Sequence, residues 1–342
     1  MTTEDNGTSD EYTISRLEQG DWKRIRALFD VTIDLQYPWK FQEWKHLDNP
    51  FGETFWLVAK AGNEVVGARA FMQWRWRGAQ HSYRAVRAVD TATHPDWRRR
   101  GIFTNLTKQM LQQVRDDGVG FVFNTPNDKS RPGYLKMGWE VVDAVPVWVR
   151  PIRPLRAAGR LLPLGDDGES DIGFDTSNVD ELLEQMDVEA LVHRAYEGES
   201  RLHTDRSAEY LRWRYAEVPG LNYRARWRGD AGAGAFAVFR RRQRGGLTEL
   251  TFSELAATPG REGMRALRKV LGEAVSRWDA DYTIGAAARN TTEMWAMAAS
   301  GFLPAPKVGP TLVFRQLSGA VEDQQLRDWS CWRCGIGDLA LF

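Results

Sequence analysis

The sequence has little cysteine, no long apolar run and no excess of either charge. Its only cysteines among 342 residues are Cys331 and Cys334. A zinc site would need two more ligands nearby, so we expect packing residues here rather than a metal or redox pair, and a cytoplasmic protein. No stretch of about 18 apolar residues occurs, which excludes a membrane-spanning helix. Lys plus Arg and Asp plus Glu both number 46, and this balance argues against binding nucleic acid or an anionic membrane by bulk charge.

The composition is that of a soluble globular protein with a large core. Hydrophobic residues make up 42% of the chain and aromatic residues 11%. At about 150 residues per domain, the length predicts two domains. Residues 1–11 are polar and acidic, which predicts a disordered tail before the first domain.

Strand-like and helix-like segments alternate over residues 12–150, which predicts an α/β domain with a mixed sheet. The expected strands span residues 12–17, 54–60, 64–76, 84–93, 119–124 and 139–149. Three helices are expected. The first begins near residue 20, and the other two span residues 104–117 and 130–137. An aromatic segment at residues 35–52 is predicted to be a loop or short helices, whose side chains either line a pocket or cover a sheet edge.

The second half of the chain repeats this order after a linker. Residues 151–173 are rich in proline and glycine, as linkers are. Helices and strands alternate again over residues 174–318, beginning with a helix expected at residues 179–196, and residues 319–342 form a tail. The repeat predicts two copies of one α/β plan.

A basic loop follows the strand that ends at His94. It contains Arg98, Arg99, Arg100 and Gly101, and a helix begins directly after it. Backbone N–H groups at such a loop, with the positive end of a helix behind them, form an anion site. A solvated basic turn explains the loop equally well.

A second informative stretch follows the buried strand expected at residues 119–124. Asn127 stands at the mouth of the next helix, and Tyr134 follows two turns later on the same face. A tyrosine in this position is able to protonate a departing thiolate. A tyrosine on a short helix also serves simply as core.

Together these two stretches resemble the GCN5-related N-acetyltransferase (GNAT) superfamily. The segment Arg98 to Phe103 is similar to its Gln/Arg-x-x-Gly-x-Gly/Ala pyrophosphate loop, with Phe103 in place of the last small residue. Asn127 with the segment Tyr134 to Trp139 is similar to its Asn-x6-Tyr-x-Lys-x-Gly-Phe/Trp pattern. The resemblance covers residues 12–150 and implies two GNAT-like domains in tandem, as in bacterial proteins of polysaccharide or natural-product pathways.

The resemblance implies direct transfer of an acyl group from acetyl-CoA, or another acyl-CoA, to an amine, without a covalent enzyme intermediate and without a metal. The implied acceptor is a small molecule such as an amino sugar or a biosynthetic intermediate. O-acylation of a similar acceptor and a non-catalytic CoA-binding module are the alternatives. No nucleic acid or membrane partner is implied, and the sequence leaves the oligomeric state open.

The resemblance also assigns roles to residues. Tyr134 is the implied general acid toward the CoA sulfur, and Asp90 and His94 are the candidates for the base. Each candidate base also has a local explanation, because Asp90 is able to bond nearby backbone and His94 to cap the turn before Pro95. The implied cofactor-binding residues are Val89, Thr91, Arg98, Arg99, Arg100, Gly101, Ile102, Phe103, Thr104 and Asn127.

The second half keeps the plan but not the motifs. Pro259 removes one donor N–H from its loop, and Met297 stands where the tyrosine is expected. A thioether cannot protonate a thiolate, so we expect a degenerate copy that forms a wall of the acceptor pocket. Residues 209–215 either belong to that wall or form a structural amphipathic helix. The tail at residues 335–342 either places a terminal carboxylate near the reaction centre or adds a strand to one domain.

Overall fold

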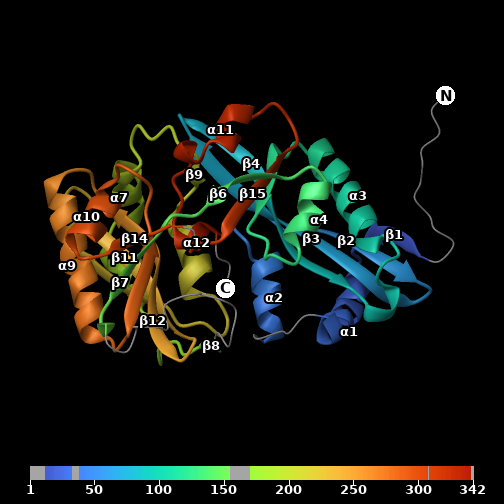
Figure 1. Ribbon diagram of the computed structural model, residues 1–342, viewed down its shortest axis with the longest axis horizontal. Helices are drawn as coiled ribbons and strands as arrows, with labels where there is room; N and C mark the ends of the chain where they lie inside the picture. The colour runs from blue at the N-terminus through green and yellow to red at the C-terminus, as the bar shows by residue number, and fades with distance from the viewer. Residues whose placement is uncertain (1–11, 33–37, 155–169, 307, 340–342) are drawn as a thin grey trace.

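The computed structural model describes residues 12–32, 38–154, 170–306 and 308–339. Two mixed sheets lie side by side, each packed against helices (Figure 1). The first half of the chain builds the right-hand part of this view and the second half builds the left-hand part. The tail predicted at residues 1–11 and most of the predicted linker lie outside the described residues.

The first sheet has the strand order β1-β2-β3-β4-β5-β15-β6, and β9 pairs with β3. These strands are β1 (Thr13–Arg16), β2 (Phe55–Ala61), β3 (Glu64–Gly78), β4 (His81–Thr93), β5 (Phe121–Asn124), β6 (Glu140–Ala144), β9 (His203–Thr204) and β15 (Thr311–Gln316). Neighbouring strands are antiparallel except β4 and β5, which are parallel.

The second sheet has the order β10-β11-β12-β13-β7-β14, and β8 pairs with β11. These strands are β7 (Val147–Pro151), β8 (Ser170–Asp171), β10 (Arg224–Arg228), β11 (Ala235–Arg244), β12 (Leu247–Ala257), β13 (Tyr282–Ala286) and β14 (Leu303–Ala305). Here β12 and β13 are the parallel pair. The order of strands along the chain therefore resembles that of the first sheet, and the mixed α/β fold predicted from the sequence is confirmed.

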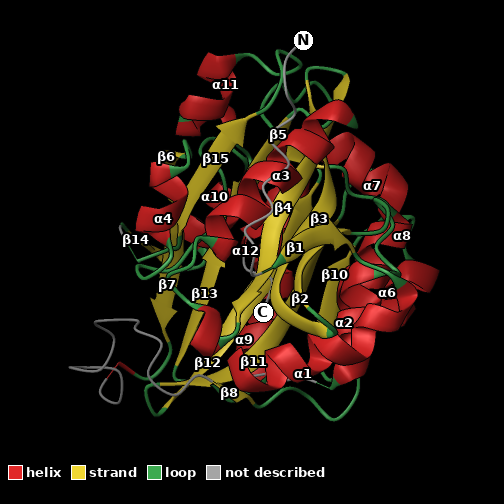
Figure 2. Cartoon of the chain, turned by 90° about the vertical axis from the view of Figure 1, so that its right-hand side faces the viewer, coloured by secondary structure: helices red, strands yellow, loops and turns green. Residues whose placement is uncertain are grey.

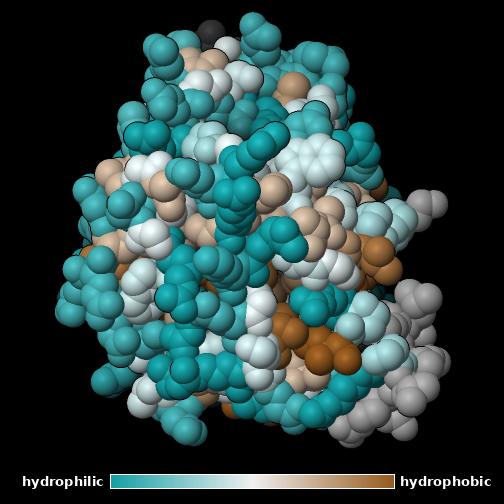
Figure 3. Space-filling model, turned by 90° about the vertical axis from the view of Figure 1, so that its left-hand side faces the viewer, coloured by the Kyte–Doolittle hydropathy of each residue, from teal (hydrophilic) through white to brown (hydrophobic). Residues whose placement is uncertain are grey.

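Helices cover both faces of each sheet. On the first sheet, α1 (Trp22–Thr32) and α2 (Trp39–His46) pack on one face, and α3 (Ile102–Asp116) with α4 (Arg131–Lys136) on the other. On the second sheet, α6 (Val179–Gln185) and α7 (Val188–Ala195) oppose α9 (Arg261–Arg277) and α10 (Thr292–Ala299). The outer surface of this second half is mainly hydrophilic (Figure 3).

The two sheets exchange one strand each. One strand was expected at residues 139–149, but the chain forms β6 in the first sheet and β7 in the second. Pro146 lies between them, and a proline cannot donate to a strand ladder. In return, β15 from the second half of the chain inserts between β5 and β6 (Figure 2). The domain boundary expected at residue 150 therefore divides the chain into two halves, but each sheet contains a strand from the other half.

Two further expectations of secondary structure differ from the structure. The helix expected at residues 179–196 is two helices, because Asp187 caps α7 by accepting a hydrogen bond from the N–H of Ala190. The tail is helical in its described part, in α11 (Asp323–Arg327) and α12 (Ile336–Leu339), and adds no strand there.

An aromatic core joins the two halves. The rings of Trp44 in α2 and Trp213 stack with centroids 4.9 Å apart, and each indole N–H donates to the other residue's carbonyl. Phe51 stacks on Tyr210 at 5.6 Å. The segments at residues 38–52 and 209–215 therefore pack against each other, and the latter forms α8 (Ala208–Leu211) and a π-helical turn whose aromatic side chains are buried.

The strand exchange predicts that residues 1–145 do not fold alone. This fragment lacks β15, whose residues Val313 and Phe314 are fully buried. We expect no cooperative transition in a thermal melt followed by circular dichroism. Thr311 pairs with Ala144, so joining residue 145 to residue 310 through a short glycine-rich turn should restore β15 and a cooperative melt. A cooperative melt of the unmodified fragment would contradict the prediction.

Candidate active site

The parallel strands β4 and β5 separate in the middle of the first sheet. They pair only from Ala85 to Arg87 on β4, and β5 ends at Asn124. Beyond Arg87, β4 continues to Thr93 beside β3. In the described part of the chain, this stretch of β4 has no strand on its second edge, so its backbone groups are able to bond an extended ligand.

A β-bulge lies in this open stretch of β4, at Asp90. Arg69 of β3 pairs with Thr91 and Ala70 pairs with Val89, so Asp90 is the additional residue. Its φ is +38°, which is uncommon for a residue other than glycine. A bulge turns the backbone away from the ladder. Val89 and Thr91, the predicted pantetheine residues, flank it.

The last two residues of α2 hold the Asp90 carboxylate. Lys45 Nζ lies 2.9 Å from Asp90 Oδ1, and His46 Nε2 lies 2.7 Å from Asp90 Oδ2. The three side chains are 8%, 0% and 15% exposed for Lys45, His46 and Asp90. Nothing in the local sequence marks Lys45 or His46, because more than forty residues separate them from Asp90.

These contacts set the charges of the cluster. Burial by itself raises the pKa of Asp90, but Lys45 and His46 outweigh it and hold that pKa well below its ordinary value. Burial lowers the pKa of His46, and Asp90 opposes this only in part. His46 is therefore neutral at pH 7, donating from Nε2 to Asp90 and accepting at Nδ1 from the Thr54 hydroxyl, 3.0 Å away.

Such a carboxylate is a weak base, which disfavours Asp90 as the proton acceptor. It also bonds α2 side chains rather than the nearby backbone. His94 is the N-cap of the short turn η2 (Pro95–Trp97), where its Nδ1 accepts from the N–H of Asp96 at 3.3 Å. This is the local role that the sequence offered for His94.

The basic loop leads into the N-terminus of α3. Gly101 is the N-cap residue with φ +75°, and Arg99 also has a positive φ, +65°. The first four N–H groups of a helix have no acceptor within it, and glycine has no side chain to cap them. The arginines at 98, 99 and 100 are exposed around this end, and the guanidinium of Arg100 lies 4.6 Å from the Trp97 ring centroid. Open donors and positive charge therefore coincide, as an anion site requires.

Tyr134 lies beside the bulge on the opposite face from α2. It is 6% exposed, and its hydroxyl oxygen accepts a hydrogen bond of 2.9 Å from Arg69 Nη1. The same nitrogen donates to the Thr91 hydroxyl. Arg69 therefore links the tyrosine to the bulged strand. The only local signal for Arg69 is a charged residue within the otherwise apolar stretch Val65 to Met72 of β3.

Phe103, the departure from the family's loop pattern, points toward α4. Its ring meets Tyr134 edge to face with centroids 5.8 Å apart, and it lies close to Gly133. Asn127 is exposed, and its side-chain oxygen accepts from the N–H and the hydroxyl of Ser130 at 3.0 and 2.9 Å. Asn127 therefore closes the turn that leads to Ser130, the N-cap residue of α4.

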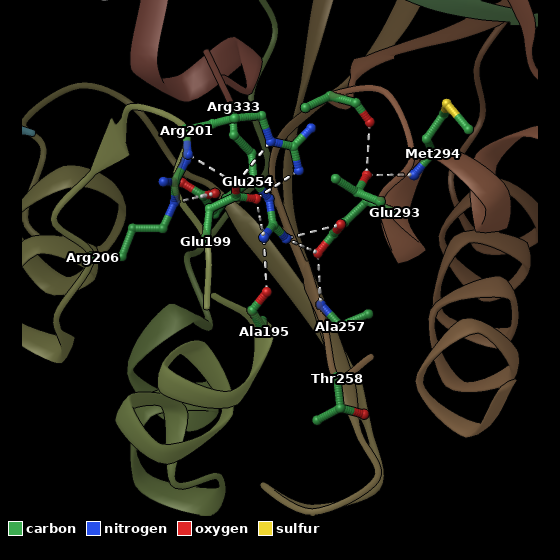
Figure 4. A network of polar contacts seen from close by, with 12 residues as sticks. Ala195, Glu199, Arg201, Arg206, Glu254, Ala257, Thr258, Glu293, Met294 and Arg333 are labelled. Atoms are coloured by element: carbon green, nitrogen blue, oxygen red, sulfur yellow. Dashed lines mark hydrogen bonds and ion pairs between the residues drawn. The ribbon is translucent and has the colours of Figure 1, made fainter. Parts of the chain in front are cut away.

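The second sheet has a corresponding bulge, but its cleft is filled. The register of β11 and β12 shifts so that Ser253 is the additional residue. Beside it, Glu293 accepts from the N–H of Ala257 at 3.2 Å and pairs with Arg333 Nη2 at 3.1 Å (Figure 4). The cavity left there is about 20 Å³, which holds no more than a water molecule. Met297 is buried against Gly285 of β13.

A family comparison agrees with this geometry. Residues 13–142 match the family model described as an acetyltransferase (GNAT) domain. That segment is therefore similar to a GNAT acetyltransferase domain. The match supports an acetyltransferase, and GNAT domains in general bind acyl-CoA. A comparison with curated protein sequences gives no match.

Solved structures share the fold at low sequence identity. A probable N-acyltransferase from Enterococcus faecalis V583 is 11% identical with a TM-score of 0.60, covering 91% of this chain and 73% of that one. A GCN5-related N-acetyltransferase from Anabaena variabilis is also 11% identical with a TM-score of 0.60, and the match covers 90% of this chain and 73% of that one. A GCN5-related N-acetyltransferase from Kribbella flavida is 12% identical with a TM-score of 0.56, and the match covers 90% of this chain and 71% of that one. The likeness of fold extends well beyond residues 13–142, to nine-tenths of this chain.

The described residues give no indication of two other kinds of site. None of their helices has the length and apolar character needed to cross a membrane. No three His, Cys, Asp or Glu side chains gather there as a group that could hold a metal ion. Cys331 and Cys334 are free thiols, the second of them buried.

The Asp90 cluster yields a prediction about stability. Asp90→Asn should lower the free energy of unfolding at pH 7 by about 3 kcal/mol, because Lys45 then lies buried beside a neutral amide. The folded-state pKa of Asp90 lies below its unfolded value of about 3.9, so its contribution is present above that pH and is lost as the pH falls. The difference from the parent in urea unfolding should therefore shrink at pH 3.

Asp96→Asn is the matched control, because the Asp96 side chain is 86% exposed. It should leave stability at pH 7 unchanged. A difference between parent and Asp90→Asn that is equally large at pH 7 and pH 3 would contradict the proposed charge state of Asp90.

Proposed function

We propose that the protein transfers an acetyl group from acetyl-CoA to the amine of a small molecule, directly within a ternary complex. The observation that carries this proposal is the position of the Tyr134 hydroxyl, which Arg69 links to the open, bulged stretch of β4. A strand edge for the donor and a proton source for its thiol thus lie together on a GNAT domain.

The donor would lie along the separated strands, with its pyrophosphate at the start of α3. The N–H groups from Arg99 to Thr104 would bind the phosphate oxygens, supported by the positive end of the helix. The open edge of β4 at Val89 and Thr91 would pair with the pantetheine arm. Asn127 lies at the entrance of α4, where its remaining amide donors would face the cofactor.

The chemistry requires one new bond and one proton transfer to sulfur. The amine nitrogen attacks the thioester carbon, and a backbone N–H at the bulge stabilises the negative charge that develops on the carbonyl oxygen. The carbon–sulfur bond then breaks, and Tyr134 donates its hydroxyl proton to the departing sulfur. The products are an amide and CoA with a free thiol.

The proton that the amine loses needs an acceptor. The low pKa of Asp90 and the capping role of His94 disfavour both as bases. We propose that water carries this proton away and returns one to Tyr134.

The second half of the chain would close the acceptor site. Arg87 on β4 donates to the carbonyls of Asp338 and Leu339, and the Thr125 hydroxyl donates to Leu339 at 3.0 Å. The last turn of α12 is thereby held against the point where β4 and β5 separate. Residues 340–342, which carry the terminal carboxylate considered above, lie outside the described residues.

We therefore assign catalysis to residues 12–150 and a supporting role to residues 174–318. Two features support this division. The filled cleft beside Ser253 leaves no room for a second CoA, and the buried Met297 supplies no acid. An amino sugar or a biosynthetic intermediate is the proposed class of acceptor.

Thiol release from acetyl-CoA tests the proposal. The chain is assayed with a panel of small amines and with matched hydroxyl compounds, and thermal shift is measured with CoA. Turnover of an amine is the expected result. Turnover of hydroxyl compounds alone would replace it with O-acylation, and a CoA-dependent shift without turnover would replace it with a binding module. Neither turnover nor shift would overturn it.

The basic loop should control affinity for the donor. Replacing Arg98, Arg99 and Arg100 by alanine should raise the KM for acetyl-CoA about tenfold at low salt and weaken its dependence on ionic strength. The matched control replaces three exposed arginines of α9, which changes the net charge equally. These are Arg261, Arg265 and Arg268. Equal effects of the two triple variants would contradict a local phosphate site.

Tyr134→Phe should lower kcat about 100-fold, because general acid catalysis of thiol departure is lost. The KM for acetyl-CoA should change little, since the ring still packs against Phe103 and Trp139. Steady-state kinetics at pH 7 measure both values. A kcat equal to that of the parent would remove Tyr134 from the mechanism.

A further inference from the structure

We infer that Arg69 is a positioning residue for the general acid: its buried cation orients the Tyr134 hydroxyl and stabilises the phenolate left after proton transfer. This inference rests on the proposed function, in which Tyr134 protonates the CoA thiolate. Arg69 lies outside both sequence motifs, and its role follows from the structure.

Arg69 is a fully buried cation without a carboxylate partner among the described residues. Its exposed fraction is 0%, and its hydrogen bonds go to two hydroxyls, those of Thr91 and Tyr134. Its Nε and Nη2 atoms are buried and have no acceptor in this part of the chain. Two other buried arginines contrast with it, since Arg206 pairs with Glu254 and Asp338, and Arg242 with Glu249.

An uncompensated buried charge is costly, because burial removes its hydration. Three aromatic rings compensate only in part through cation–π contact. The guanidinium carbon lies 4.8 Å from the Phe71 centroid, 5.2 Å from that of Tyr134 and 5.6 Å from that of Phe103. A side chain that opposes stability in this way is explained by a function, and the group that it contacts is the proposed acid.

The direction of the hydrogen bond suits that function. Arg69 Nη1 donates and the Tyr134 oxygen accepts, so the hydroxyl hydrogen remains free to point at the donor sulfur. When the carbon–sulfur bond breaks, the sulfur takes this proton and the tyrosine oxygen becomes negative. Arg69 then faces an anion at hydrogen-bond distance in a dry environment, where such a contact is strong. Solvent later returns the proton to Tyr134.

The test compares Arg69→Met, Arg69→Lys, Tyr134→Phe and the double variant Arg69→Met/Tyr134→Phe. Thiol release is followed with an amine that turns over, or with water as the acceptor if hydrolysis of acetyl-CoA is the only reaction. Arg69→Met should lower kcat about 10- to 100-fold with little change in KM for acetyl-CoA. Arg69→Lys should recover most of this loss, because it keeps the cation.

The double variant separates this role from a structural one. If Arg69 acts through Tyr134, Arg69→Met should cause no further loss of kcat in the Tyr134→Phe background. A loss that multiplies with that of Tyr134→Phe would overturn the inference. A parental kcat for either Arg69→Met or Tyr134→Phe would also overturn it, whereas the proposed function itself would be overturned only if the parent showed neither turnover of acetyl-CoA nor a CoA-dependent thermal shift.

Thermal melting provides a readout that is independent of activity. Methionine fills a similar volume without charge, so Arg69→Met should melt no lower than the parent. The matched control is Arg242→Met, which removes the closer of the two cations beside the buried Glu249, leaves only Arg244 at 3.8 Å, and should lower Tm by several degrees. A drop in Tm for Arg69→Met as large as that for Arg242→Met would show a structural role and overturn the inference.

Discussion

The hydrogen bonds that β15 makes between β5 and β6 are the constraint on which the rest of the structure depends. They place a strand from the end of the chain in the first sheet, while β7 from the first half lies in the second sheet. The two halves are thereby held in one arrangement. That arrangement brings α8 and the following π-helical turn against α2, and it brings α12 to the end of β5. The candidate active site is therefore bordered by both halves, although its motifs belong to one.

Within that frame, charge is concentrated on the two faces of the bulge in β4. On one face, Lys45 and His46 hold the Asp90 carboxylate, and on the other, Arg69 donates to Thr91 and Tyr134. The bulge keeps its positive φ because tertiary contacts hold it on both sides. The second sheet has a bulge at the corresponding strand, but Glu293 and Arg333 fill the space beside it. The same plan therefore supports an open cleft in one half and a closed ion pair in the other.

Much of the site was predictable because its motifs are local. The loop at residues 98–101 and the helix after it are contiguous in the chain. Asn127 lies just before the short helix α4, and Tyr134 lies within it. Lys45, His46 and Arg69 were not predictable, because their partners lie 22 to 65 residues away. The expectation of a single strand at residues 139–149 was wrong for a similar reason. Hydropathy predicts that a segment is a strand but not the sheet in which it pairs. The division into catalytic and supporting halves stays a prediction.

The sequence by itself determined the mixed α/β class, the alternation of helices and strands, and the motifs that resemble GNAT. Each of these depends on residues that are close together in the chain. Only the tertiary structure decided which strands share a sheet, which side chains face the bulge and what charge they carry. These depend on burial and on contacts between distant segments. The pKa of Asp90 shows the difference, since burial would raise it, and Lys45 and His46, brought in by α2, lower it instead.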